Sequence, residues 1–177
     1  MNFSEIIKES SSKDWSLDIF TKRVVIFGCG NVLFGDDGFG PQVIEYLLAH
    51  YKLPEDVYVL DVGTSIRSIL FDLLLSPQKP QKVILIDAVQ FPERAPGEIF
   101  EIDVDGMPTS KTPDFSIHQG PTINFLKELK TLSQLDVHIV VVQAKYIPDQ
   151  VEPGLSEEVQ KAVPEMCIYL KQLWGQP

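Results

Sequence analysis

The stretch Lys82-Val83-Ile84-Leu85-Ile86-Asp87 decides the fold of this chain. It is almost wholly apolar until it ends in an acid. A short apolar run without polar alternation is typical of a strand that is buried on both faces of a parallel sheet. We therefore expect it to be the central strand of such a sheet.

The sequence before this strand alternates short apolar runs with helical periodicity. Runs at Val24–Phe27 and Val57–Leu60 predict two strands. Apolar positions between 43 and 51, and again between 66 and 74, recur at helix spacing and predict two helices. The order strand, helix, strand, helix is typical of an α/β protein.

The sequence after the central strand completes the pattern. Apolar residues alternate with acids from 100 to 104, which predicts a half-exposed antiparallel edge strand. A helix over 123–129, a buried strand over 137–142 and a closing helix over 159–173 follow. The predicted fold class is therefore α/β, a doubly wound, mostly parallel sheet with one antiparallel edge strand and helices on both faces.

Length and composition limit the possible functions. The 177 residues, 44% of them apolar, suffice for one core, so we expect a single α/β domain over 21–177 that follows an N-terminal extension, 1–20. A net charge of −10 argues against binding to nucleic acid or anionic membranes. Charges interrupt the first twenty residues, and Cys29 and Cys167 lie outside any CxxC motif. These features favour a cytoplasmic protein without a disulfide framework.

The segment from Gly28 to Pro41 follows the first predicted strand and has two possible interpretations. It does not match a dinucleotide-binding loop, because Leu33 replaces the third glycine of GxGxxG. Asp36 and Asp37 would also place negative charge where a pyrophosphate needs donors. The pair suits a cation instead, although one of the two could simply cap the helix that starts near Pro41.

Further acids and a histidine stand where an α/β site is expected. In open sheets, sites form beyond the carboxyl ends of the parallel strands, and Asp61 and Asp87 end the second and third predicted strands. His118 lies in a polar loop before the predicted third helix. Asp37, Asp87 and His118 could together bind a divalent transition metal and leave coordination positions open. A loop histidine could equally be a solvated side chain.

Three other residues have alternative interpretations. We expect His138, inside an apolar strand, to be a packed core residue, and His50 to interact favourably with a helix C-terminus. Cys29, between two glycines, raises the alternative of a cysteine nucleophile. The neighbouring carboxylates would raise the pKa of its thiol, which weakens this alternative.

The quoted segments resemble those of the hydrogenase maturation proteases, which trim the C-terminal tail of the large subunit of [NiFe] hydrogenases. Four segments carry the resemblance: GCGNVLFGDDGFGP (28–41), LDVGT (60–64), ILIDAV (84–89) and SIHQG (116–120). It extends from about Val24 into the final predicted helix. The GDDGFGP form and the loop over 91–97 resemble the branch that serves coenzyme F420-reducing hydrogenases.

The resemblance implies a role for each candidate site residue. The family's metal-contacting acid, second acid and histidine fall on Asp37, Asp87 and His118. Many members have glutamate at the first position, so Asp37 shortens the reach by one methylene group. Asp61 matches another strand-end acid and is a candidate support of the cleft, as is Asp36.

The resemblance also implies the reaction and the partner. The chain would be an endopeptidase that removes the C-terminal extension of a [NiFe] hydrogenase large-subunit precursor after nickel insertion. Nickel would be supplied by the substrate, with no permanently bound cofactor. Apart from the resemblance, nothing in the sequence demands a dimer, so we expect a monomer. The alternative is a noncatalytic nickel-binding or metal-checking chaperone for hydrogenase assembly.

Overall fold

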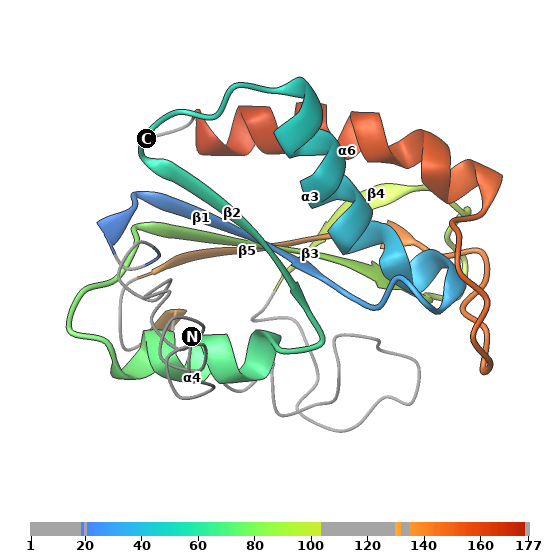
Figure 1. The fold of residues 1–177 in the computed structure, drawn as a ribbon, viewed down its shortest axis with the longest axis horizontal. Helices are drawn as coiled ribbons and strands as arrows, with labels where there is room; N and C mark the ends of the chain where they lie inside the picture. Colours follow the sequence, from blue (N-terminus) through green and yellow to red (C-terminus); the bar gives the residue numbers. More distant parts are fainter. Residues whose placement is uncertain (1–18, 20, 104–129, 132–134, 176–177) are drawn as a thin grey trace, which may run out of the picture.

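A five-stranded sheet forms the centre of the molecule (Figure 1). The computed structural model describes residues 19, 21–103, 130–131 and 135–175. The strand order is β2-β1-β3-β5-β4, so β3 is central as predicted. The strands are β1 (Val24–Cys29), β2 (Val57–Gly63), β3 (Lys82–Val89), β4 (Ile99–Ile102) and β5 (Asp136–Gln143).

The direction of the strands agrees with the sequence pattern. Strands β1, β2, β3 and β5 are parallel, and β4 pairs with β5 in the antiparallel direction at one edge. All eight residues of β3 are buried, which explains its uninterrupted apolar run. In β4, by contrast, Glu101 is exposed between partly buried neighbours.

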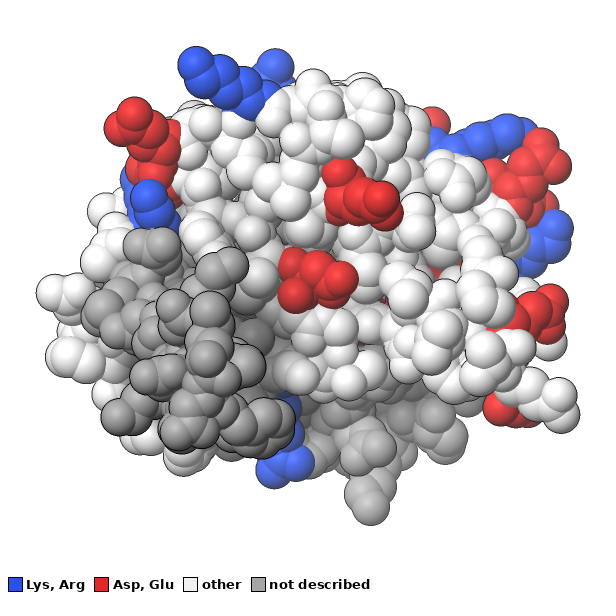
Figure 2. Space-filling model, viewed as in Figure 1, with Lys and Arg blue, Asp and Glu red and all other residues white. Residues whose placement is uncertain are grey.

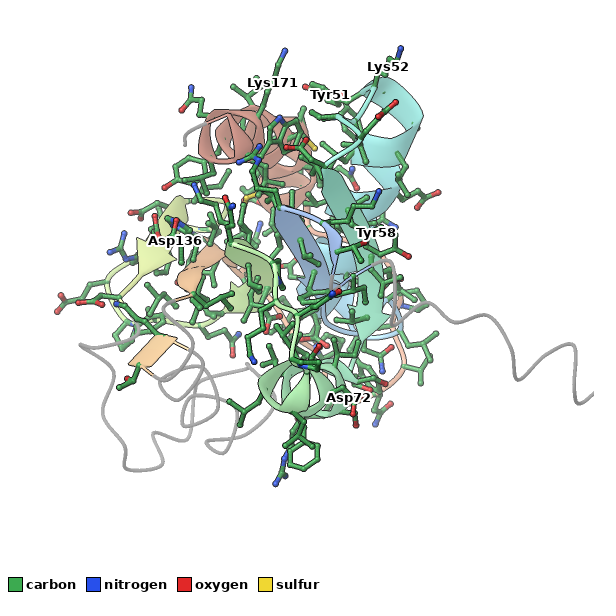
Figure 3. The ribbon with its side chains drawn as sticks, turned by 90° about the vertical axis from the view of Figure 1, so that its left-hand side faces the viewer. Tyr51, Lys52, Tyr58, Asp72, Asp136 and Lys171 are labelled. Carbon is green, nitrogen blue, oxygen red and sulfur yellow. The ribbon has the colours of Figure 1, made fainter. Side chains whose placement is uncertain are left out.

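Helices cover both faces of the sheet. Helices α3 (Phe39–His50) and α6 (Glu157–Trp174) pack on one face, and α4 (Ile66–Leu75) packs on the other. Figure 3 shows these layers, with Lys171 of α6 and Asp72 of α4 at opposite outer surfaces. Alternate residues of β3 serve the two cores: Ile84 and Ile86 face α3 and α6. The predicted doubly wound fold is confirmed.

A short 3₁₀ helix, η1 (Gly35–Gly38), connects the loop after β1 to α3. The first turn of α3 approaches the end of β1 very closely. A Cβ atom at Gly40 would lie 2.2 Å from the carbonyl oxygen of Cys29, so only glycine fits there. This close packing fixes η1 and the start of α3 directly above the carboxyl end of β1.

Two predictions fall partly outside the described residues. The expected helix over 123–129 and Val104 lie outside them, although residues 130–131 are helical. The boundary of the N-terminal extension at residue 20 stays a prediction, but Ile19 is fully buried in the core on the α4 side. None of the described helices is long and apolar enough to cross a membrane.

Candidate active site

Acidic side chains from three segments converge at the carboxyl edge of the sheet. Asp61 lies near the end of β2, Asp87 lies near the end of β3, and Asp37 lies in η1, which packs against β3. Parallel strands present their carboxyl ends at one edge of a sheet, and the short connection after β1 brings η1 to the same edge. The sequence predicted this position for all three acids.

Asp37 is buried and held by the loop that precedes it. Its side chain is 4% exposed, and the backbone N–H of Asn31 donates to Oδ2 at 2.8 Å. Gly30 allows this loop to fold back, since its φ of +126° is unfavourable for other residues. A Cβ atom at Gly30 would also lie 1.9 Å from the carbonyl oxygen of Asp37. The carboxylate of Asp37 is therefore fixed by local backbone geometry.

Asp87 has a buried oxygen that lacks a donor. The N–H of Ala88 donates to Oδ1 at 2.8 Å, but Oδ2 is buried without a hydrogen-bond partner among the described residues. Burial raises the pKa of Asp87 well above its ordinary value, and the charge of Asp37 raises it further against the lowering effect of the Ala88 hydrogen bond. A buried, donor-free carboxylate oxygen is costly unless a proton or a cation accompanies it. This arrangement suits a metal ligand.

The surroundings of Cys29 argue against a cysteine nucleophile. The thiol is 1% exposed, and burial raises its pKa well above the ordinary value. The charges of Asp87, Asp61 and Asp37 raise the pKa further, in that order. A reactive cysteine needs the opposite environment, one that favours the thiolate.

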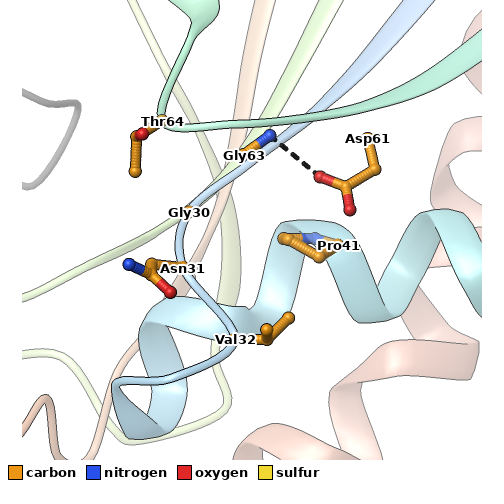
Figure 4. A pocket seen from close by; sticks show the side chains of 7 residues that line it. All are labelled: Gly30, Asn31, Val32, Pro41, Asp61, Gly63 and Thr64. Atoms are coloured by element: carbon orange, nitrogen blue, oxygen red, sulfur yellow. Dashed lines mark hydrogen bonds between the residues drawn. The ribbon is translucent and has the colours of Figure 1, made fainter. Parts of the chain in front are cut away.

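Asp61 lies in an open cleft beside this acidic group. Its carboxylate is exposed to solvent, and the N–H of Gly63 donates to Oδ1 at 2.9 Å. The cleft has a volume of about 240 Å³ (Figure 4). Its lining residues are Gly30, Asn31, Val32, Pro41, Asp61, Gly63 and Thr64. Asp61 thus presents a charged group to the cleft, while Asp37 and Asp87 are buried.

Asp36 has a structural role that differs from the predicted cap. Neither aspartate caps α3, whose N-cap residue is Gly38 and has no side-chain cap bond. The fully buried carboxylate of Asp36 instead accepts four hydrogen bonds from a distant loop. The donors are Lys145 N–H (2.8 Å), Tyr146 N–H (2.9 Å), Ser156 N–H (2.6 Å) and Ser156 Oγ–H (2.9 Å). Since Ser156 is the N-cap residue of α6, Asp36 ties η1 to the start of that helix.

His118, the third residue of the predicted triad, lies outside the described residues. Within residues 19, 21–103, 130–131 and 135–175, no group of three or more metal-ligating side chains is close enough to hold a metal ion. The described acids therefore form at most part of a metal site. The contribution of His118 stays a prediction.

Of the predictions for the other two histidines, the one for His50 is confirmed and the one for His138 is wrong. His50 is the final residue of α3, as expected, and its Nδ1 donates to the carbonyl oxygen of Tyr46 at 2.8 Å. The prediction that His138 packs in the core is wrong. It is half-buried near the sheet edge, where Nδ1 lies 2.6 Å from Glu101 and Nε2 lies 3.1 Å from Asp136. Strand pairing, invisible in the local sequence, brings Glu101 to this position.

Asn31 is a site residue that sequence reasoning missed. Its backbone N–H holds Asp37, and its side-chain oxygen accepts the N–H of Leu33 at 3.0 Å. It also lines the cleft. The position of Asn31 in the sequence could have predicted this turn, because an asparagine that follows a strand and a glycine commonly bonds to its own backbone in this way.

Comparison with known proteins identifies the family of this chain. The family described as hydrogenase maturation protease matches residues 41–171. A provisionally named hydrogenase maturation protease from Methanocaldococcus jannaschii is 42% identical over 144 residues, which are 80% of this chain and 90% of that protein. The delta subunit of coenzyme F420 hydrogenase from Methanothermobacter thermautotrophicus is 34% identical over 149 residues, 82% and 90% of the two chains.

A solved structure shows similarity to the same family. The [NiFe] hydrogenase maturation protease HybD from Thermococcus kodakarensis is 27% identical, with a TM-score of 0.64, and the match covers 85% of this chain and 98% of that one. The fold and these similarities place the chain among peptidases of the α/β class. This chain belongs to the hydrogenase maturation protease family and is a hydrogenase maturation endopeptidase.

Proposed function

We propose that this endopeptidase removes the C-terminal extension of a [NiFe] hydrogenase large-subunit precursor, and that Asp37, Asp87 and His118 bind the nickel that the precursor carries. The observation that carries the proposal is the buried oxygen Oδ2 of Asp87, which lacks a donor among the described residues. A cation at this oxygen would replace the missing partner. It would also offset the cost of burying the Asp87 charge and the repulsion by Asp37, which together raise the pKa of Asp87.

The ligand types suit nickel. Two carboxylates and one imidazole form a set that divalent transition metals accept, and they leave coordination positions for ligands from the substrate. The enzyme would bind this metal weakly alone, because three side chains supply only part of its coordination shell. Nickel would therefore belong to the substrate. Its binding to the three side chains would report that the precursor has received its metal.

The cleft supplies the remaining chemistry. Asp61 is exposed in the cleft, where it can accept a proton from the water that attacks the scissile carbonyl. The carbon–nitrogen bond then breaks, and the proton passes to the amine of the departing tail. Asp37 and Asp87 would fix the nickel-bearing part of the precursor, so that its tail passes along this cleft.

The sequence comparison supports a particular class of precursor as the partner. Similarity to a protein named as a coenzyme F420 hydrogenase subunit, together with the GDDGFGP segment, favours the precursor of an F420-reducing enzyme. We also propose that the enzyme is a monomer in the cytoplasm. The acidic surface supports a hydrogenase precursor as the partner over nucleic acid or anionic membranes. Acidic side chains are spread across the face shown in Figure 2, while Lys and Arg lie toward its periphery.

One experiment separates proteolysis from the chaperone alternative. Nickel-loaded and nickel-free precursors are incubated with the enzyme, and the mass of the precursor C-terminus is measured. Loss of the tail from the nickel-loaded form alone supports the proposal. Stable binding to the nickel-loaded form without any loss of mass would instead support the chaperone.

A further inference from the structure

Four exposed apolar side chains lie on two neighbouring loops. Val32 is 45% exposed, Leu33 44%, Tyr146 53% and Val151 64%. The first two belong to the loop between β1 and η1, and the other two belong to the loop between β5 and α6. We call these four side chains the apolar rim. Large exposed apolar groups gathered in one place are typical of surfaces that bind another protein.

Backbone hydrogen bonds hold the two loops together. The N–H of Glu152 donates to the carbonyl of Leu33 at 2.9 Å, and the N–H of Gly35 donates to the carbonyl of Glu152 at 2.9 Å. The N–H of Asp36 donates to the carbonyl of Tyr146 at 3.1 Å, and the Asp36 carboxylate adds the four bonds described above. The loops therefore form one firmly connected surface, so binding to it would cost little conformational entropy.

The apolar rim borders the cleft that contains Asp61 at one residue, Val32. Val32 is seen in the lining of the cleft in Figure 4, and Leu33 is the next residue in the chain. In Figure 1 both loops lie at the same end of the molecule, beyond the carboxyl ends of β1 and β5. A protein whose tail enters the cleft would thus have its body beside these side chains.

We propose that the apolar rim is the docking surface for the folded body of the precursor, beside the cleft that receives its tail and sharing Val32 with it. This inference rests on the proposed function, because it takes the precursor as the occupant. Exposed acids, Asp149 and Glu152, lie on the same loop as Tyr146 and Val151. The matching face of the precursor is therefore apolar with basic groups at its margin.

Charge substitutions in the apolar rim test this inference. The variant carrying Leu33→Asp and Val151→Asp places two charges in the apolar rim. The control carries Leu75→Asp and Ile168→Asp, which change apolar residues that are exposed at least as much as Leu33, at the end of α4 and on α6. Thermal unfolding of each variant verifies that it is folded. If the double variant Leu33→Asp and Val151→Asp does not fold, the single variant Val151→Asp replaces it, because Val151 is the most exposed of the four residues.

The first readout is the affinity for nickel-loaded large subunit that lacks its extension. The rim variant should bind at least tenfold more weakly than the wild type, and the control should bind within twofold. Equal affinity of rim variant and wild type would overturn the inference, as would an equal loss in the control. This readout does not depend on cleavage. Failure of the wild type to shorten the nickel-loaded precursor would reject the proposed function separately.

The second readout is the kinetics of precursor processing. The rim variant should show a KM at least tenfold higher with kcat within twofold, because the substituted residues, Leu33 and Val151, do not line the cleft. A fall in kcat with unchanged KM would contradict a docking role.

Discussion

Replacement of Asp36 by alanine should destabilise the protein by about 3–5 kcal/mol. The substitution leaves the backbone N–H groups of Lys145, Tyr146 and Ser156 without their acceptor in a partly buried position. Each unsatisfied group costs about 1–3 kcal/mol, and entry of water should keep the sum near the lower part of the range. A helix cap, the role expected from sequence, would contribute only about 1 kcal/mol.

Urea denaturation of the wild type and Asp36→Ala measures this difference directly. At roughly 2–4 °C per kcal/mol for a chain of this size, the melting temperature should fall by roughly 6–20 °C. Asp149→Ala is the matched control, because Asp149 is exposed on the loop that Asp36 anchors, and it should change stability by less than about 0.5 kcal/mol. A loss below about 1.5 kcal/mol for Asp36→Ala would refute the argument that its four hydrogen bonds anchor the loop.

Three further predictions concern the acids and the metal. Burial and the charge of Asp37 raise the pKa of Asp87, so the folded protein keeps this proton to higher pH than the unfolded chain and loses stability as the pH rises from about 4 through the raised pKa. The stability of Asp87→Asn relative to the wild type should therefore increase across that pH interval, while the variant loses processing activity. Urea titrations at several pH values measure the free energy of unfolding of both proteins. A difference between them that does not change with pH would show that the reasoning is wrong. Cys29→Ala should keep processing activity, measured by precursor mass, because the raised pKa of the thiol makes it a poor nucleophile; complete inactivity of a folded variant would restore the cysteine mechanism. Elemental analysis of dialysed enzyme should find much less than one metal ion per chain, and one tightly held zinc would favour a resident metallopeptidase centre instead.

The main features of the fold could be predicted from local patterns. The apolar run over 82–87 identified the central strand, since a strand buried on both faces has no polar alternation. The alternation after residue 99 identified the antiparallel edge strand. Asp37 and Asp87 could be placed at one edge of the sheet because parallel strands end together.

The roles of other polar residues depend on contacts that local sequence does not reveal. Asp36 meets partners 109 to 120 residues later in the chain, so its carboxylate resembled a local helix cap. His138 lies in an apolar strand, but its partner Glu101 comes from the neighbouring antiparallel strand. The apolar rim likewise depends on the pairing of Phe34 with Glu152.

The central claim is that Asp37, Asp87 and His118 act together on nickel within the precursor. The most direct test is the C-terminal mass of nickel-loaded precursor after incubation with each single alanine variant, with the melting temperature of each variant as the measure of folding. All three variants should leave the extension in place, and a cooperative melting transition shows that each variant is folded. Removal of the extension by folded His118→Ala at the wild-type rate would contradict the account.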